Sequence, residues 1–226
     1  MGLPLAIRDL QVTGPNGRVL LAVDALDVAP GSLVGVRGPS GAGKSTLLHA
    51  LGGLLPATGT VRWGDTDLLA LADERRTGFR ANHIGMIFQD FLLFEELGSA
   101  DNAALSAMFA PRARRIETRD AAAANLRRLG LEPGSRPVAS FSGGERQRVG
   151  VARALASNAP ILLADEPTAS LHREAADALI GDLVALTREH GRTLIAVSHD
   201  MHLLDRMDRV LWVEDGILRT EGQDAA

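Results

Sequence analysis

The glycine-rich stretch G-P-S-G-A-G-K-S at residues 38–45 constrains the fold more than any other part of the chain. It fits G-x-x-x-x-G-K-[ST], a loop whose backbone N–H groups turn inward onto phosphate oxygens. An apolar segment at 32–36 precedes the loop, and Leu47, Leu48 and Leu51 follow it at helical spacing. A strand, a glycine loop and a helix in this order predict a phosphate-binding α/β unit.

The lysine of this loop is the only lysine in the chain, because the other 23 of the 24 basic residues are arginines. Lysine carries a compact charge that enters a tight loop, where the wide guanidinium of arginine cannot replace it. We therefore expect Lys44 to reach the β- and γ-phosphates of a nucleotide. The expected nucleotide-binding residues of the loop and the following helix start are Gly38, Pro39, Ser40, Gly41, Ala42, Gly43, Lys44, Ser45 and Thr46.

Two adjacent carboxylates, Asp165 and Glu166, end the apolar run I-L-L-A-D-E at 161–166. Such a run predicts a buried strand of an α/β sheet. Asp165 is then suited to hold Mg²⁺ together with Ser45, and Glu166 is suited to accept a proton from attacking water. The alternative is that an acidic residue caps the helix that begins near Glu174, which explains one carboxylate but not the pair.

Composition narrows the class of protein. The chain has 226 residues, 46% of them hydrophobic, no cysteine and a net charge of −4. These values exclude disulfides and argue against broad nucleic-acid binding, so we expect no nucleic-acid partner. The N-terminus lacks the basic start and apolar core of a signal peptide, and no stretch is apolar enough for a membrane helix. We expect an intracellular protein.

The segment F-S-G-G-E-R-Q-R-V-G-V-A-R-A-L-A at 141–156 resembles the signature of ATP-binding-cassette (ABC) ATPases. Ser142 and the N–H groups of Gly143 and Gly144 open a helix, which creates a second anion site. The resemblance implies that two chains, identical or different, pair head-to-tail and that each signature closes on the ATP of the other chain. It also implies that Gln89 is the glutamine that senses Mg²⁺ and the γ-phosphate, and that His199 is the switch histidine.

The resemblance covers nearly the whole chain and implies an α/β fold: a P-loop NTPase (RecA-like) core, an N-terminal antiparallel β region and a helical subdomain insertion. ATP and Mg²⁺ are the implied cofactors, with Ser45, Gln89 and Asp165 at the metal and Glu166, His199, Lys44 and Gln89 in catalysis. We expect a single nucleotide-binding domain over 1–226, with the core at about 1–90 and 150–220 and the helical subdomain at about 91–149. Within it we expect β structure over 3–35 and 58–64 and further strands near 84–88, 160–164 and 193–197.

The expected helices of the subdomain cover 100–109 and 119–129, and Gly130 should end the second. We expect a polar connection, A-P-R-A-R-R-I, between these helices and frayed residues at 220–226.

Within the family, residues 51–61 and 88–102 resemble ATPases of the lipoprotein-release and macrolide-export type, as does Glu145 in the signature. This implies export or membrane extraction by a separate transmembrane permease that docks near Phe91–Asn102, with the chain at the cytoplasmic face of the membrane. The apolar residues after Gln89 suit docking, although they could also be core residues. The alternatives are a cell-division-type mechanotransmission ATPase and a soluble ABC ATPase without a transport role.

Two features depart from the family pattern. No tyrosine occurs, and no aromatic residue precedes His49, so adenine is expected to lie on Val12, Val19 or the Arg18 guanidinium. His172 stands where the family usually has an aspartate that links the two chains. Three interpretations remain open: a weaker, pH-dependent contact across the dimer, a slow site in an asymmetric heterodimer, or a substitution with little effect.

Overall fold

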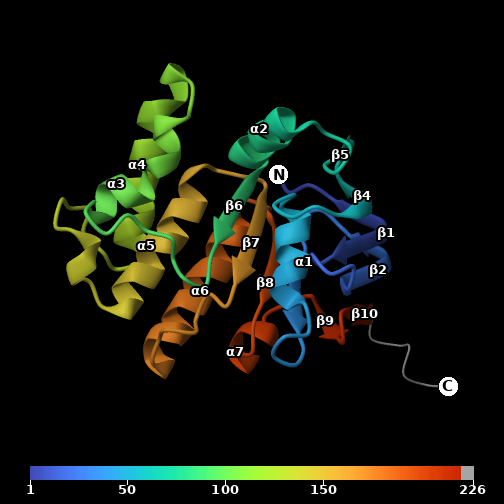
Figure 1. Ribbon diagram of the computed structural model, residues 1–226. Helices are drawn as coiled ribbons and strands as arrows, with labels where there is room; N and C mark the ends of the chain where they lie inside the picture. The colour runs from blue at the N-terminus through green and yellow to red at the C-terminus, as the bar shows by residue number, and fades with distance from the viewer. Residues whose placement is uncertain (220–226) are drawn as a thin grey trace.

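In the computed structural model, residues 1–219 are described, so the predicted fraying of residues 220–226 lies outside the described part. Ten strands in this part form one sheet in the order β5-β4-β1-β2-β10-β9-β3-β8-β7-β6 (Figure 1). Its strands are β1 (Leu5–Thr13), β2 (Val19–Val28), β3 (Leu33–Arg37), β4 (Thr58–Trp63), β5 (Thr66–Asp67), β6 (Ile84–Ile87), β7 (Ile161–Asp165), β8 (Thr193–Val197), β9 (Arg209–Glu214) and β10 (Ile217–Arg219).

The N-terminal side of the sheet is antiparallel, as predicted. β1 pairs with β2 on one side and with β4 on the other. Burial alternates along β1, with Leu5 and Ile7 inside, as expected of a sheet with one wet face. Residues 33–35 are an exception to the predicted range 3–35, because β3 pairs in parallel with β8 and β9.

The central strands β9, β3, β8, β7 and β6 are all parallel to one another. β7 and β8 are buried at every residue, which accounts for their continuous apolar sequences. Parallel strands end at the same edge of a sheet, so the residues that follow β3, β6, β7 and β8 meet there. A single parallel pairing between Ile217 of β10 and Ala22 of β2 joins this core to the antiparallel side.

The helices divide into two groups (Figure 1). The helices associated with the sheet are α1 (Lys44–Leu51), α2 (Asp73–His83), α6 (Arg173–Glu189) and α7 (Met201–Leu204). The helices of the insertion are α3 (Ser99–Ala103), the short 3₁₀ helix η1 (Leu105–Met108), α4 (Arg112–Arg128), the short 3₁₀ helix η2 (Val138–Ser140) and α5 (Gly143–Ala156). In Figure 1 the insertion lies beside the sheet, at the end that β6 occupies. α5 runs past the predicted end of the helical subdomain at about residue 149.

The predicted polar connection A-P-R-A-R-R-I is wrong. α4 begins at Arg112, so most of this stretch forms its first turns. The arginines are good helix formers, and Pro111 directly before the helix has a fixed φ that suits an N-terminus. The predicted helix over 100–109 is also divided, between α3 and η1. Gly130 ends α4 with a φ of +72°, as predicted.

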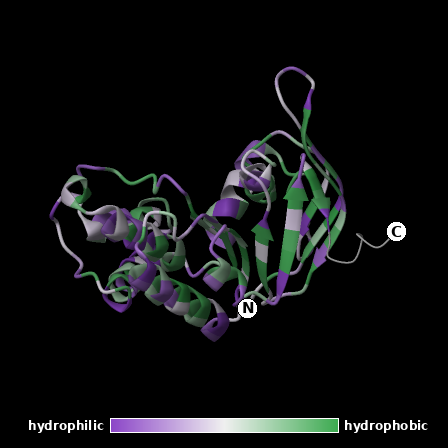
Figure 2. Cartoon of the chain, turned by 90° about the horizontal axis from the view of Figure 1, so that it is seen from below, coloured by the Kyte–Doolittle hydropathy of each residue, from purple (hydrophilic) through white to green (hydrophobic). Residues whose placement is uncertain are grey.

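Two hydrophobic clusters support the two parts of the molecule. One contains the inner residues of the antiparallel strands together with α1, including Trp63, whose Nε1 donates to the Leu51 carbonyl at 3.0 Å. The other joins α4, α5 and α6 to the sheet. Figure 2 shows the strands as mostly hydrophobic and the insertion helices as mixed, which is typical of helices with one packed and one wet face. Over residues 1–219, no helix is both long and apolar enough to span a bilayer.

Candidate nucleotide site

The glycine loop lies between β3 and α1, as predicted. A Cβ on Gly38 would lie 1.9 Å from the Val213 carbonyl oxygen, and Gly43 has a φ of +102°. Both positions therefore require glycine. The Lys44 ammonium donates to the carbonyls of Gly38 at 2.9 Å and Pro39 at 2.8 Å, so it lies across the loop rather than in solvent.

Four segments meet at the carboxyl edge of the parallel strands and line one cavity of about 490 Å³. They are the glycine loop, the segment after β6, the end of β7 with the loop after it, and the turn after β8. The predicted residues that line this cavity are Ser40, Gly41, Lys44, Ser45, Gln89, Asp165, Glu166 and His199. The topology of the sheet therefore brings together residues as far apart in the sequence as Ser40 and His199.

Asp165 has the properties of a metal ligand. Asp165 as a whole is 7% exposed, and its Oδ1 atom has no hydrogen-bond partner. A buried carboxylate oxygen without a partner costs folding free energy unless a cation or a hydrogen-bond donor contacts it. Over residues 1–219, no group of three or more His, Cys, Asp or Glu side chains is arranged to hold a metal ion by itself. A single carboxylate beside the Ser45 hydroxyl fits Mg²⁺, which keeps several waters and takes further ligands from phosphates.

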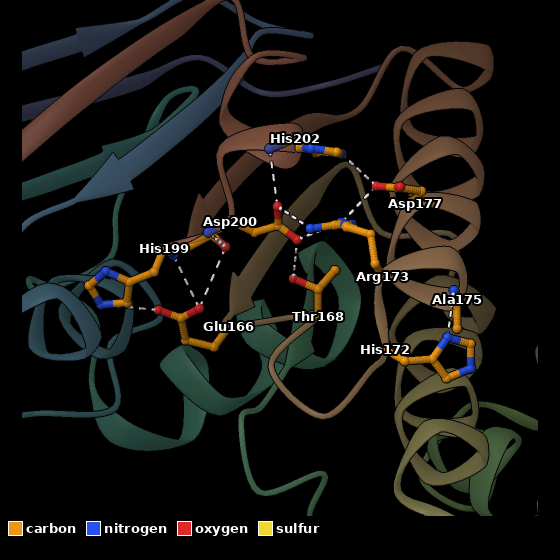
Figure 3. Close-up of polar contacts among 10 residues, drawn as sticks. Glu166, Thr168, His172, Arg173, Ala175, Asp177, His199, Asp200 and His202 are labelled. Atoms are coloured by element: carbon orange, nitrogen blue, oxygen red, sulfur yellow. Dashed lines mark hydrogen bonds and ion pairs between the residues drawn. The ribbon is translucent and has the colours of Figure 1, made fainter.

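Glu166 is held in an unusual conformation. Its φ of +46° is left-handed, which is rare for a residue with a side chain and frequent at functional sites. Its carboxylate accepts from the His199 N–H at 3.3 Å and from the Ser198 hydroxyl at 3.5 Å, and its Oε1 lies 3.6 Å from His199 Nε2 (Figure 3). Burial raises the pKa of Glu166 above its ordinary value. A raised pKa suits a carboxylate that must accept a proton.

The segment after Gln89 is tied to α5. Phe91 and Leu92 have φ values of +60° and +48°, and the Arg153 guanidinium donates to both of their carbonyls, at 2.6 and 2.5 Å. This clamp turns the chain sharply after Gln89. Of the apolar residues predicted to dock a partner, Leu92 is 57% exposed and Phe94 is 52% exposed. Leu97 is half-buried, and Leu93 packs on the second hydrophobic cluster.

The loop that displays Phe94 is held by one buried amide. The Asn102 side chain accepts from the Phe94 N–H at 2.9 Å and donates to the carbonyls of Phe94 and Leu97, at 2.9 and 3.1 Å. Asn102 is fully buried. The exposed Phe94 side chain therefore lies on a loop that these hydrogen bonds anchor.

The signature opens α5 as predicted, with Ser142 as its N-cap. Glu145 completes a capping box: its carboxylate accepts from the Ser142 N–H at 2.8 Å, and its own N–H donates to the Ser142 hydroxyl at 3.2 Å. The bonds that the Ser142 N–H and the Ser142 hydroxyl donate to the carboxylate, at 2.8 and 2.9 Å, lower the pKa of Glu145. Ser142, Gly143 and Gly144 do not line the cavity of this chain. Instead, a Cβ on Gly143 would lie 3.6 Å from Ser170, in the loop that follows Glu166.

His172 is the N-cap of α6. Its Nδ1 atom accepts from the Ala175 N–H at a long 3.5 Å (Figure 3). The sequence alternative in which Asp165 or Glu166 caps this helix is therefore wrong, because α6 begins only at Arg173. An aspartate at this position would make the same bond with a charged acceptor, so the substitution keeps the cap and removes its charge.

The structure reduces the set of residues that are expected to contact adenine. Val12 is 3% exposed and belongs to the core, so it cannot contact a base. Val19 is 43% exposed, and Arg18 is exposed beside it. These two remain the predicted contacts.

Thr168 and Asp200 also line the cavity, and neither is among the residues predicted for the site. Asp200 directly follows His199 and precedes the short apolar stretch M-H-L-L, so an N-cap signal was present there. It does cap α7, by accepting from the His202 N–H at 3.0 Å. Thr168 carried no comparable signal.

Comparison with known proteins identifies the class to which this fold and cavity belong. The family described as ABC transporter matches residues 21–169, which is more than half of the chain. The chain belongs to this family, in its ATP-binding part. It is 39% identical over 203 residues to the lipoprotein-releasing system ATP-binding protein LolD of Hyphomonas neptunium, covering 89% of this chain and 88% of that protein.

Other relatives are similarly close. An uncharacterized ABC transporter ATP-binding protein of Escherichia coli, YbbA, is 41% identical over 200 residues, covering 87% of this chain and 86% of that protein. The macrolide export ATP-binding/permease protein MacB of Bradyrhizobium diazoefficiens is 40% identical, over 95% of this chain but only 33% of MacB. A dimeric ATP-binding cassette, MJ0796, solved with ADP and phosphate, superposes with a TM-score of 0.85 at 30% identity, covering 96% of this chain and 98% of that one.

Proposed function

We propose that the chain is the ATP-binding and ATP-hydrolysing subunit of an ABC transporter that works with a separate transmembrane permease. The observation that carries this proposal is the single cavity in which the glycine loop, Gln89, the Asp165–Glu166 pair and His199 meet. The relatives LolD and MacB, whose names state lipoprotein release and macrolide export, support export or membrane extraction as the direction.

Each residue of the cavity has a role in this proposal. Lys44 and the loop N–H groups bind the phosphates of ATP, while Ser45, Gln89 and Asp165 hold Mg²⁺. When bound, Mg²⁺ supplies charge neutralisation at the β- and γ-phosphate oxygens. Glu166 accepts the proton of the attacking water, and its raised pKa improves that acceptance. His199, whose Nε2 lies 3.6 Å from the Glu166 carboxylate, would contact the γ-phosphate.

The signature is proposed to bind the ATP of a second ATPase chain. Ser142, Gly143 and Gly144 lie outside the cavity of their own chain, at a helix N-terminus that favours anions. In a head-to-tail dimer they would close on the ATP of the partner, as the dimeric cassette relatives support. ATP binding would then close the dimer, and hydrolysis would release it.

The loop within Phe91–Asn102 is the proposed docking site of the permease. Its exposed residues Leu92 and Phe94 follow within a few positions of Gln89, which lines the cavity. Movement of a partner on this loop would therefore reach the nucleotide through a short connection. The chain would reside in the cytoplasm, at the inner face of the membrane, through this contact.

The proposal is tested by ATP hydrolysis of the purified full chain with Mg²⁺. We expect Glu166→Gln to abolish turnover and to retain ATP binding, because the amide cannot accept the proton but keeps the shape of the site. Glu117→Gln, on the exposed face of α4, is the matched control and should hydrolyse ATP at the native rate. Native turnover by Glu166→Gln would contradict the assigned role.

A further inference from the structure

Arg173 is an unusual first residue for α6. A cation at a helix N-terminus meets the partial positive charge of the helix dipole, and acidic residues are preferred there. Arg173 is also half exposed, so burial does not explain it. Its partners therefore have to account for its place in the structure.

Those partners are two carboxylates. The guanidinium grips Asp200 with two parallel bonds, from Nη1 to Oδ1 at 3.0 Å and from Nη2 to Oδ2 at 2.9 Å. Nη2 also lies 2.6 Å from Oδ1 of Asp177, one turn further along α6. Figure 3 shows Arg173 between the two carboxylates. A two-pronged contact of this kind fixes orientation as well as distance, so Asp200 is held in one position by α6.

Asp200 in turn connects the two segments that carry Glu166 and His199. Its Oδ2 accepts from the Thr168 hydroxyl at 3.1 Å, in the loop after Glu166. Its N–H donates to the Ser198 hydroxyl at 3.0 Å, and that hydroxyl donates to Glu166. The side chain of Asp200 is only 13% exposed, so these bonds are shielded from water.

We propose that Arg173 is a positioning residue for ATP hydrolysis: it holds Asp200, and thereby keeps the Thr168 loop and the Ser198–His199 turn in the arrangement that places His199 against Glu166. Arg173 does not line the cavity and touches no reacting atom. It acts from the first turn of α6, next to His172, so a change at this helix end is transmitted to the turn after β8. This inference rests on the roles proposed above for Glu166 and His199.

The contact is expected to affect geometry more than stability. Arg173 is 48% exposed while Asp200 is 13% exposed, and solvent around the exposed guanidinium screens the pair, so it contributes little to folding. Displacing a reacting group by a fraction of an ångström has a far larger effect, because a shift of about 1 Å can cost about 100-fold in rate. Removing Arg173 should therefore slow hydrolysis without unfolding the chain.

The test compares steady-state ATP hydrolysis by full-length Arg173→Met, Arg173→Lys and Arg128→Met. Arg128 is the matched control, because it also makes a two-pronged pair with a residue of α6, Glu189, at 2.7 and 2.9 Å, but at the far end of that helix. We expect Arg173→Met to lower kcat about tenfold with KM for ATP within about threefold. Arg173→Lys should recover part of kcat, and Arg128→Met should remain native.

Asp200→Asn tests whether Arg173 acts through Asp200. If it does, Arg173→Met should lower kcat little further in the Asp200→Asn background, because the two changes interrupt the same connection. Independent, multiplying losses would contradict the proposal, as would a native kcat for Arg173→Met. Equal losses in Arg173→Met and Arg128→Met would show a general effect of ion pairs on α6. Full activity in Glu166→Gln would overturn the proposed function itself, whereas an inactive Glu166→Gln beside a native Arg173→Met would overturn only this inference.

Discussion

The Glu166 carboxylate should reduce the stability of the folded chain at neutral pH. Its side chain is 15% exposed and burial raises its pKa, so the ionised form is less favourable in the folded state than in the unfolded state. Glu166→Gln removes the charge and keeps a carbonyl oxygen that can accept from the His199 N–H, now at 3.3 Å. We therefore expect the variant to be more stable than the native chain at pH 7 to 8.

The size of the gain follows from the site. The two hydrogen bonds that the carboxylate receives are long, at 3.3 and 3.5 Å, so they compensate little of the burial cost. We expect a gain on the order of 1 kcal/mol, within the usual range for single substitutions. For a domain of this size, that is a rise of roughly 2–4 °C in Tm.

The raised pKa of Glu166 also determines how the stability difference depends on pH. A carboxyl whose folded pKa is raised destabilises the fold when it is ionised in both states, and this penalty disappears as pH falls below the unfolded pKa. The gap in Tm between Glu166→Gln and the native chain should therefore be largest at pH 7 to 8 and should shrink toward pH 4. Thermal unfolding without nucleotide measures it, with Glu117→Gln as the control that changes Tm by less than about 1 °C. A gap that is absent at pH 7, or that widens toward acid, would refute the reasoning.

Three further predictions follow from single residues. His172→Asp should strengthen the cap of α6 and raise Tm by about 2 °C. It should also raise the rate of ATP hydrolysis. If the rate and its pH profile stay unchanged, neither a weaker dimer contact nor a slow site in a heterodimer accounts for the histidine at this position. GTP should displace ATP at less than tenfold higher concentration in nucleotide competition, because Val19 and Arg18 offer no aromatic surface to distinguish the bases; a preference of tenfold or more for ATP would count against this. Gly38→Ala should lose ATP binding in an equilibrium assay, since its Cβ would lie 1.9 Å from the Val213 carbonyl oxygen; native affinity would show that the loop does not need this close approach.

The parts of the fold that the sequence predicted well are those with strong local patterns. The glycine loop, the buried strands β7 and β8 and the helix that opens at Ser142 each combine an apolar run with distinctive boundary residues. Parallel strands then bring the predicted cavity residues together without further information. The arginine-rich start of α4 differs from the predicted polar connection, because a dense run of charge is compatible with a helix and arginine is a good helix former.

Other features depend on contacts that no local pattern reveals. The capping role of His172 follows from where α6 begins, and imidazole is not among the usual capping side chains. The Arg173–Asp200 contact joins residues 27 positions apart through the packing of α6 beside the turn after β8. The clamp of Arg153 on the carbonyls of Phe91 and Leu92 spans about 60 positions. Each of these depends on the tertiary fold.

The most direct test of the account is recovery of the permease from membranes. Tagged Glu166→Gln would be expressed in the cell of origin, the membranes solubilised with ATP and Mg²⁺ present, and the captured proteins identified. A matched variant that also carries Phe94→Glu tests the docking loop, and one that carries Leu54→Glu, an exposed apolar residue elsewhere, is its control. The account predicts that a multi-helix permease is captured in the presence of ATP, is lost with Phe94→Glu and is kept with Leu54→Glu. Capture of a dimer with no membrane protein would contradict it.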